Sequence, residues 1–116
     1  MIGEDCHAIS VGETVSCLGE DCAQQLARVL GQAVEQAAHH NKDSYHIITL
    51  PDYTMRVIVL SSKSIILLHL HKEQGAMIAY AESTLYQNFV LWFQGMVQHT
   101  FNVVLRACNV NQVAYT

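Results

Sequence analysis

Residues 45–81 read YHIITLPDYTMRVIVLSSKSIILLHLHKEQGAMIAYA, and this stretch decides the fold. Runs rich in Ile, Val, Leu, Thr and Tyr favour strands, and clusters of turn-forming residues separate these runs. The clusters are Pro51-Asp52, SSKS at 61–64 and EQG at 73–75. The pattern predicts strands at residues 45–50, 55–60 and 65–71, followed by a fourth strand, or the tail of a long hairpin, at 76–81.

The run at residues 65–71 begins with four consecutive apolar residues. An unbroken apolar run is typical of a central strand that is covered on both faces. We therefore expect Ile66 and Leu68 to be buried. The full set of expected core residues is Ile48, Val57, Val59, Ile66, Leu68, Phe89 and Phe93.

Residues 21–38 are predicted to form a helix, because apolar residues such as Leu26 and Leu30 recur there at helical spacing. Asp21 is a favoured N-cap residue, and Gln24, three positions later, completes a capping-box pattern. Asn41 follows the last periodic residues and suits the left-handed position that ends many helices. The sequence therefore predicts both ends of this helix.

A long C-terminal helix is predicted over residues 84–108, where Leu85, Phe89 and Phe93 contribute to an apolar stripe at helical spacing. Upstream, residues 7–18 contain two short strand-forming runs around Gly12-Glu13, which is a possible tight hairpin. These elements place residues 1–116 in one α+β domain. We expect a single antiparallel sheet of four or five strands, a middle helix and a long C-terminal helix.

Small residues cover much of the helix predicted at residues 21–38. Ala is the best helix former, which gives their abundance a local explanation. Gly31, however, costs about 1 kcal/mol relative to Ala and invites a packing reason. A second interpretation is therefore a contact surface that another chain approaches closely. The residues assigned to this interface are Ala23, Ala27, Leu30, Gly31, Val34 and Ala38, with Trp92 and Met96 on the last helix.

The composition is 51% apolar and 14% charged, with a formal net charge of −4. This balance excludes disorder, and six Lys and Arg residues are too few for a nucleic-acid-binding face. Glu4 and Asp5 stand where a signal peptide would carry positive charge. Polar residues such as Gln94 and Asn102 interrupt the most apolar segment, which argues against a membrane span. We expect a cytoplasmic protein with reduced cysteines and apolar surface that needs a partner.

Seven histidines raise the question of a metal site. His69 and His71 are two residues apart and would lie on the same face of a strand. No Cys-x-x-Cys or His-x-x-x-His spacing supplies further ligands, so we expect both at polar positions on the less buried sheet face. The sequence predicts no metal and no cofactor.

Nucleophilic catalysis has one candidate residue. Cys22 falls in the first turn of the predicted helix, where the helix dipole favours a thiolate. A small residue that packs between elements is the preferred interpretation. Because the chain contains no recognisable catalytic motif, it is predicted to have no enzymatic activity.

The order of the predicted elements resembles the roadblock (dynein light-chain) family over residues 20–97. The resemblance is carried by the Ala-rich helix at 21–38, the strands at 47–50 and 55–60, and the segment SSKSIILLHLHKEQGAMIAYAES that begins at Ser61. The family has a further helix before its first strand, and only six residues precede His7 here. A profilin-like or secretion-chaperone-like α+β fold is therefore the alternative.

The roadblock resemblance implies a non-catalytic homodimer, or a heterodimer with a similar domain, that pairs through an edge strand and the middle helix. It also implies a platform for a small Ras-like GTPase or for a scaffold complex. The sequence therefore predicts a scaffold or adaptor subunit. The alternative is a secretion-type or assembly chaperone that binds a peptide segment of a partner protein.

Overall fold

The computed structural model describes residues 8–71 and 75–115. Their strands are β1 (Ala8–Ser10), β2 (Val15–Leu18), β3 (Ser44–Thr49), β4 (Thr54–Leu60), β5 (Ser64–His71), β6 (Gly75–Glu82) and β7 (Ala107–Tyr115). The helices are α1 (Cys22–His40) and α2 (Tyr86–Phe101), and a 3-10 turn (Ser83–Leu85) precedes α2. The prediction of an α+β fold with one antiparallel sheet is confirmed.

The strands of the described residues form one sheet in the order β1-β7-β3-β4-β5-β6, and β2 also pairs with β7. Every pairing is antiparallel. The meander β3–β6 was predicted correctly, with each strand within a residue or so of its expected bounds. The sheet is larger than expected, with seven strands in the described residues instead of four or five. The extra width comes from β1, β2 and β7.

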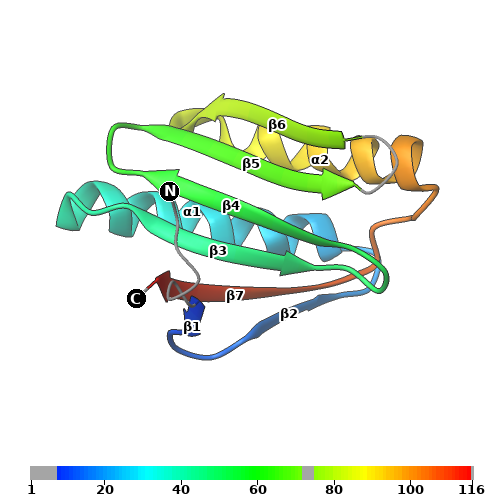
Figure 1. The fold of residues 1–116 in the computed structure, drawn as a ribbon, viewed down its shortest axis with the longest axis horizontal. Helices are drawn as coiled ribbons and strands as arrows, with labels where there is room; N and C mark the ends of the chain where they lie inside the picture. Colours follow the sequence, from blue (N-terminus) through cyan, green and yellow to red (C-terminus); the bar gives the residue numbers. More distant parts are fainter. Residues whose placement is uncertain (1–7, 72–74, 116) are drawn as a thin grey trace.

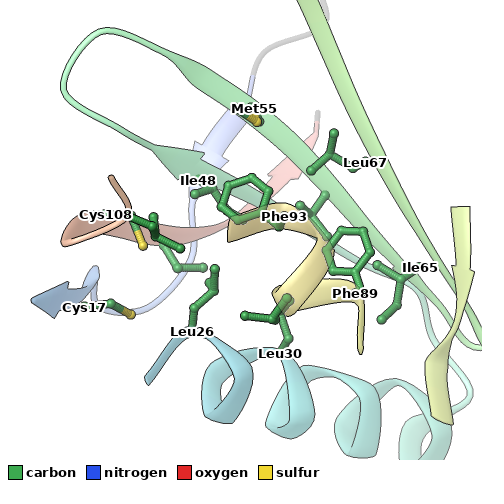
Figure 2. Packing of buried hydrophobic residues seen from close by; sticks show 14 of the residues in the cluster. Cys17, Leu26, Leu30, Ile48, Met55, Ile65, Leu67, Phe89, Phe93 and Cys108 are labelled. Atoms are coloured by element: carbon green, nitrogen blue, oxygen red, sulfur yellow. The ribbon is translucent and has the colours of Figure 1, made fainter. Parts of the chain in front are cut away.

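Both helices pack on one face of the sheet, which we call the inner face (Figure 1). Side chains from the helices and from alternate strand positions point toward one another and form the core (Figure 2). Ile48, Val57, Val59, Phe89 and Phe93 are buried as predicted. The opposite, outer face has no layer over it in residues 8–71 and 75–115.

The predicted burial phase of β5 is wrong. Ile65 and Leu67 are fully buried on the inner face, while Ile66 and Leu68 lie on the outer face and are only partly buried. Successive side chains of a strand point to opposite faces, and the described helices cover only one of them. The sequence IILL contains no alternation that could reveal which face this is.

The predicted C-terminal helix is too long, because α2 ends at Phe101. Asn102 adopts the left-handed conformation with φ of 56°, and its backbone N–H bonds to the carbonyl of Val97. The chain then forms β7 instead of more helix, and Cys108 and Val110 alternate there with polar residues. The predicted hairpin is also wrong, since β1 and β2 both pair with β7. His7 lies outside the described residues.

The start of α1 is fixed by a different glutamine from the one predicted. Asp21 occupies the N-cap position but makes no side-chain cap bond. Instead, the amide of Gln25 donates to the carbonyl of Leu18 at 2.8 Å and to Asp21 Oδ1 at 2.8 Å, and it accepts from the N–H of Leu18 at 3.1 Å. Asn41 ends the helix with φ of 50°, as predicted. Gln25 thus ties α1 to β2.

Candidate functional site

Three buried thiols, of Cys17, Cys22 and Cys108, lie on the inner face, where the start of α1 contacts β2 and β7; Figure 2 labels Cys17 and Cys108. The Sγ atoms of Cys22 and Cys108 are 3.8 Å apart, and Cys22 Sγ donates to the carbonyl of Cys17 at 3.3 Å. Cys17 and Cys108 are opposite each other in the β2–β7 ladder. The structure holds these three as free thiols, and Cys6 lies outside the described residues.

Burial raises the pKa of Cys17, Cys22 and Cys108 above the ordinary thiol value. For Cys22, this loss of solvation outweighs the hydrogen bond with Cys108, which acts in the opposite direction. Among the described residues, the Cys22 thiol bonds to the other two cysteines and to no imidazole. A nucleophilic cysteine needs a lowered pKa or a neighbouring base. The preferred interpretation, a small packing residue, therefore fits the geometry of Cys22.

His69 is buried on the inner face, which corrects the prediction of a polar position on the less buried face. Its Nδ1–H donates to the carbonyl of Thr54 at 3.2 Å, and its ring lies edge-on to Phe101 with centroids 5.2 Å apart. The side chain of His71 lies outside the described part of the chain. No group of three or more metal-ligating side chains assembles within the described residues.

A hydroxyl and an imidazole meet at the start of β3, and the sequence analysis missed this pair. Ser44 Oγ and His46 Nε2 are 2.9 Å apart, and burial lowers the pKa of His46. They line a cavity of about 240 Å³ together with Gln32, Gln36 and Gln112. A hydrolytic serine also needs a third group that orients the histidine. Glu13 lines the same cavity, but among the described residues the hydrogen bond of His46 is the one with Ser44.

The predicted interface residues do not share one surface. Leu30 and Met96 are buried in the core, Val34 packs against the core from its edge, and Ala38 is exposed. Trp92 is 42% exposed on α2.

Gly31, Ala23 and Ala27 face α2 of the same chain. A Cβ atom on Gly31 would lie 2.9 Å from the ring of Tyr86. Ala23 and Ala27 line a cavity of about 450 Å³ that Tyr86 and Leu91 also line. The approach of α2 therefore gives the small side chains of α1 an intramolecular packing reason.

The outer face of the sheet divides into two halves. Over β1, β2 and β7 it carries a group of polar side chains that bond to one another. Ser16 Oγ donates to Asn109 Oδ1 at 2.9 Å, while Ser10 and Thr14 donate to Asn111 Oδ1 at 3.2 and 2.9 Å. We call Ser10, Thr14, Ser16, Asn109 and Asn111 the polar half. Its amide carbonyls already have protein donors.

The other half of the outer face, over β3 to β6, is apolar. Ile47, Arg56, Leu68 and Ile78 are successive partners across the four strands, and Tyr45, Ile58, Ile66 and Tyr80 form the next row. Leu70, Ile78 and Tyr80 are 83%, 70% and 66% exposed. We define the apolar half as Ile47, Ile58, Ile66, Leu68, Leu70, Ile78 and Tyr80.

The apolar half is a site that the sequence analysis did not find. A signal for it was present in β6, where bulky Ile78 and Tyr80 alternate with Ala79 and Ala81. A strand with this alternation normally turns its bulky residues, here Ile78 and Tyr80, toward the core and its alanines toward the outside. Here the alanines face the helices and the bulky residues face outward.

The geometry defines a class: a two-layer α+β protein with an open antiparallel sheet, helices on one face and an uncovered apolar surface on the other. The sequence matches no protein-family model and no curated protein. Among solved structures, the crystal structure of the Pseudomonas avirulence protein AvrPphB is similar, with a TM-score of 0.58 and 9% sequence identity. The match covers 92% of this chain and 54% of that chain, so this protein spans about half the length of the matched one. At this identity the likeness shows the fold alone.

These findings overturn the roadblock resemblance. The structural match is to a different protein, and β7 lies between β3 on one side and β1 and β2 on the other. The sequence analysis assigned no strand after residue 81, so it could not anticipate this arrangement. The pairing mode and the GTPase platform that the resemblance implied lose their basis with it. No helix in the described residues has the length and hydrophobicity to span a membrane.

Proposed function

We propose that this protein is a non-catalytic adaptor subunit that binds another protein through the apolar half of its outer sheet face. The observation that supports this function is the exposure of Leu70, Ile78 and Tyr80 beside partly buried neighbours on one continuous surface. Contiguous apolar patches of this kind on proteins in water usually mark contact sites. Fully burying one Leu or Ile side chain contributes about 1.5–3 kcal/mol.

The charge of this surface indicates the chemistry of the partner. Arg56 is exposed between Ile47 and Leu68 in the row of strand partners, and it is the charged residue of the two rows. A carboxylate on the partner can bond to its guanidinium at the edge of an apolar contact. The proposed partner surface is therefore apolar, with an acidic side chain placed opposite Arg56.

The state of the candidate reactive groups supports binding over catalysis. Cys22 is a buried thiol whose pKa is raised, and His46 bonds to Ser44 without a third orienting group among the described residues. Among the described residues, Cys22 has no hydrogen bond to a base, and the Ser44–His46 pair has no bonded group that orients the imidazole. The apolar half, in contrast, is open to a macromolecule.

Site-specific photo-crosslinking in cells that express the protein tests this function. A photoreactive amino acid at Leu70 should give a discrete protein adduct, because this side chain is the most exposed one of the apolar half. The matched control is the same amino acid at Asn109, which is exposed on the polar half.

The adduct at Leu70 should disappear when Arg56→Glu reverses the charge beside it. No adduct at Leu70, or equal adducts at Leu70 and Asn109, would contradict the proposed function. Identification of the adduct by mass spectrometry should show a partner with an acidic residue beside an apolar surface.

A further inference from the structure

One edge of the sheet is long and unpaired. β6 ends the strand order and pairs with β5 alone among the described strands. It is eight residues long, whereas β1 and β2 at the other end have three and four. Short edge strands are one way in which proteins prevent edge-to-edge pairing. Only the β1–β2 end of this sheet has that protection.

β6 also lacks the other features that block a sheet edge. Its sequence, GAMIAYAE, contains no Lys and no Pro, and Glu82 at its end is its one charged residue. The β5–β6 register runs without a bulge from Ser64 opposite Glu82 to His71 opposite Gly75. Charges, prolines and bulges are the usual protection of such an edge. An edge without them is competent to pair with another strand.

Apolar side chains flank this edge on both faces of the sheet. On the outer face, Ile78 and Tyr80 are 70% and 66% exposed. On the inner face, Ala79 and Ala81 line a cavity of about 390 Å³, which is completed by Leu85 of the 3-10 turn and by Asn88, Phe89 and Trp92 of α2. A strand added to β6 would bury apolar surface on both sides of its backbone.

The sequence of β6 is complementary to itself. In an antiparallel pair with a twofold axis at Ala79, Ile78 lies opposite Tyr80 of the partner subunit, and the same pair forms a second time. Pairs of an aromatic and a β-branched residue stabilise neighbouring strands. Each Glu82 lies opposite Ala76 of the partner subunit, so the two Glu82 positions are six residues, or about 20 Å, apart along the strands. Like charges therefore do not meet at this interface.

We infer that two copies of this chain pair through β6, antiparallel and edge to edge, to form one continuous sheet. The interface is isologous, so one substitution alters it at two places. It uses the edge of the sheet and leaves Leu70 and Ile66 open for a partner on the outer face. Ile78 and Tyr80 belong both to this edge and to the proposed adaptor surface, so the two proposals are told apart by their readouts, the oligomeric state for the edge and the crosslink from Leu70 for the outer face.

Trp92 provides a signal for this contact. It is the one tryptophan of the chain, and it lines the cavity beside β6. The ring centroids of Trp92 and Phe89 are 5.8 Å apart, and the Trp92 side chain is 42% exposed. Pairing through β6 should bury it further and shift its fluorescence emission to shorter wavelength as the protein concentration rises.

The test combines sedimentation velocity with Trp92 fluorescence over a wide concentration range. Ile78→Lys places a charge at the edge, as natural edge strands do, and should raise the dimer dissociation constant by roughly a hundredfold, because both copies carry the change. Leu91→Lys is the matched control, since Leu91 is 65% exposed on α2 and lines the cavity between α1 and α2 instead. It should leave the dimer unchanged. Circular dichroism and thermal melts confirm that both variants fold.

A wild-type protein that stays monomeric at all concentrations, with constant Trp92 emission, would overturn the inference. A dimer of Ile78→Lys as tight as that of Leu91→Lys would also overturn it. If wild type is monomeric but a synthetic peptide of residues 75–82 shifts the Trp92 emission, the edge binds extended peptides and the second-copy inference is wrong. The crosslink from Leu70 is scored separately, so failure of the dimer and failure of the adaptor function are distinguishable.

Discussion

The polar and apolar halves of the outer face belong to the same sheet but differ in the hydrogen bonding and exposure of their side chains. In the polar half, Asn109 and Asn111 accept hydrogen bonds from Ser16, Ser10 and Thr14 of the neighbouring strands. In the apolar half, the hydroxyl of Tyr80 bonds with that of Ser64 at 3.0 Å, but Leu70 and Ile78 carry no polar side-chain atom and are 83% and 70% exposed. Exposed hydrogen bonds contribute little net free energy, whereas apolar surface gains about 25 cal/mol for each Å² removed from water. This difference is the reason for proposing a binding surface over β3–β6 and not over β7.

The largest expected effect tests whether the apolar half is surface and not core. Leu67 and Leu68 are consecutive residues of β5, with Leu67 fully buried and Leu68 partly exposed. Leu67→Ala should lower the free energy of unfolding by about 2–5 kcal/mol, because it leaves a cavity in the core. Leu68→Ala should lower it by about 1 kcal/mol or less. Urea denaturation measures both, and equal losses would place Leu68 in a second buried layer.

A smaller effect tests whether the polar half is held by its own hydrogen bonds. Asn111→Ala removes the acceptor of both Ser10 and Thr14, and we expect a loss of about 1 kcal/mol and faster amide exchange in β1. Asn109→Ala removes one such bond and is the matched control, with about half the loss. The crosslink from Leu70 should persist in both variants. A lost crosslink would mean that the two halves form one binding surface.

The smallest effect concerns the inner face beneath the polar half. Burial lowers the pKa of His46 from 6.5, so the unfolded state binds its proton more readily than the folded state does. The free energy of unfolding therefore carries no penalty from His46 above pH 6.5, and it falls as the pH drops from there toward the lower pKa that His46 has in the folded state. His46→Gln should show a flatter dependence of the free energy of unfolding on pH. A wild-type profile that is flat across this range, or that rises on acidification, would contradict the assignment.

Local sequence signals predicted the meander but not the whole sheet. Pro51-Asp52 and the SSKS turn fixed the ends of β3, β4 and β5, because turn chemistry is decided by neighbouring residues. The helix end at Asn41 was predictable for the same reason. β7 was not, since its place between β3 and β2 depends on pairings between residues that are 60 positions apart (Thr49 with Asn109) to 107 positions apart (Ala8 with Tyr115).

The candidate site was missed because face assignment is a tertiary property. Ile65, Ile66, Leu67 and Leu68 are equally apolar, and only the position of the helices separates the buried pair from the outward pair. Gly31 is a second position at which the packing element could not be read from the sequence. Its missing side chain was read as room for a second chain, whereas the ring of Tyr86 occupies that space. In both cases the sequence around a residue does not show which element packs against it.

The place of β7 in the sheet has a consequence for how the chain is made. β1 and β2 emerge first during synthesis, yet their strand partner in the described chain is β7, which follows every other element. Until residues 107–115 leave the ribosome, β1 and β2 have no ladder to join and one edge of β3 stays open. Contacts between such distant residues form slowly. Until β7 is made, β1, β2 and β3 are therefore exposed to wrong strand pairing, and the arrival of β7 ends that risk for all three.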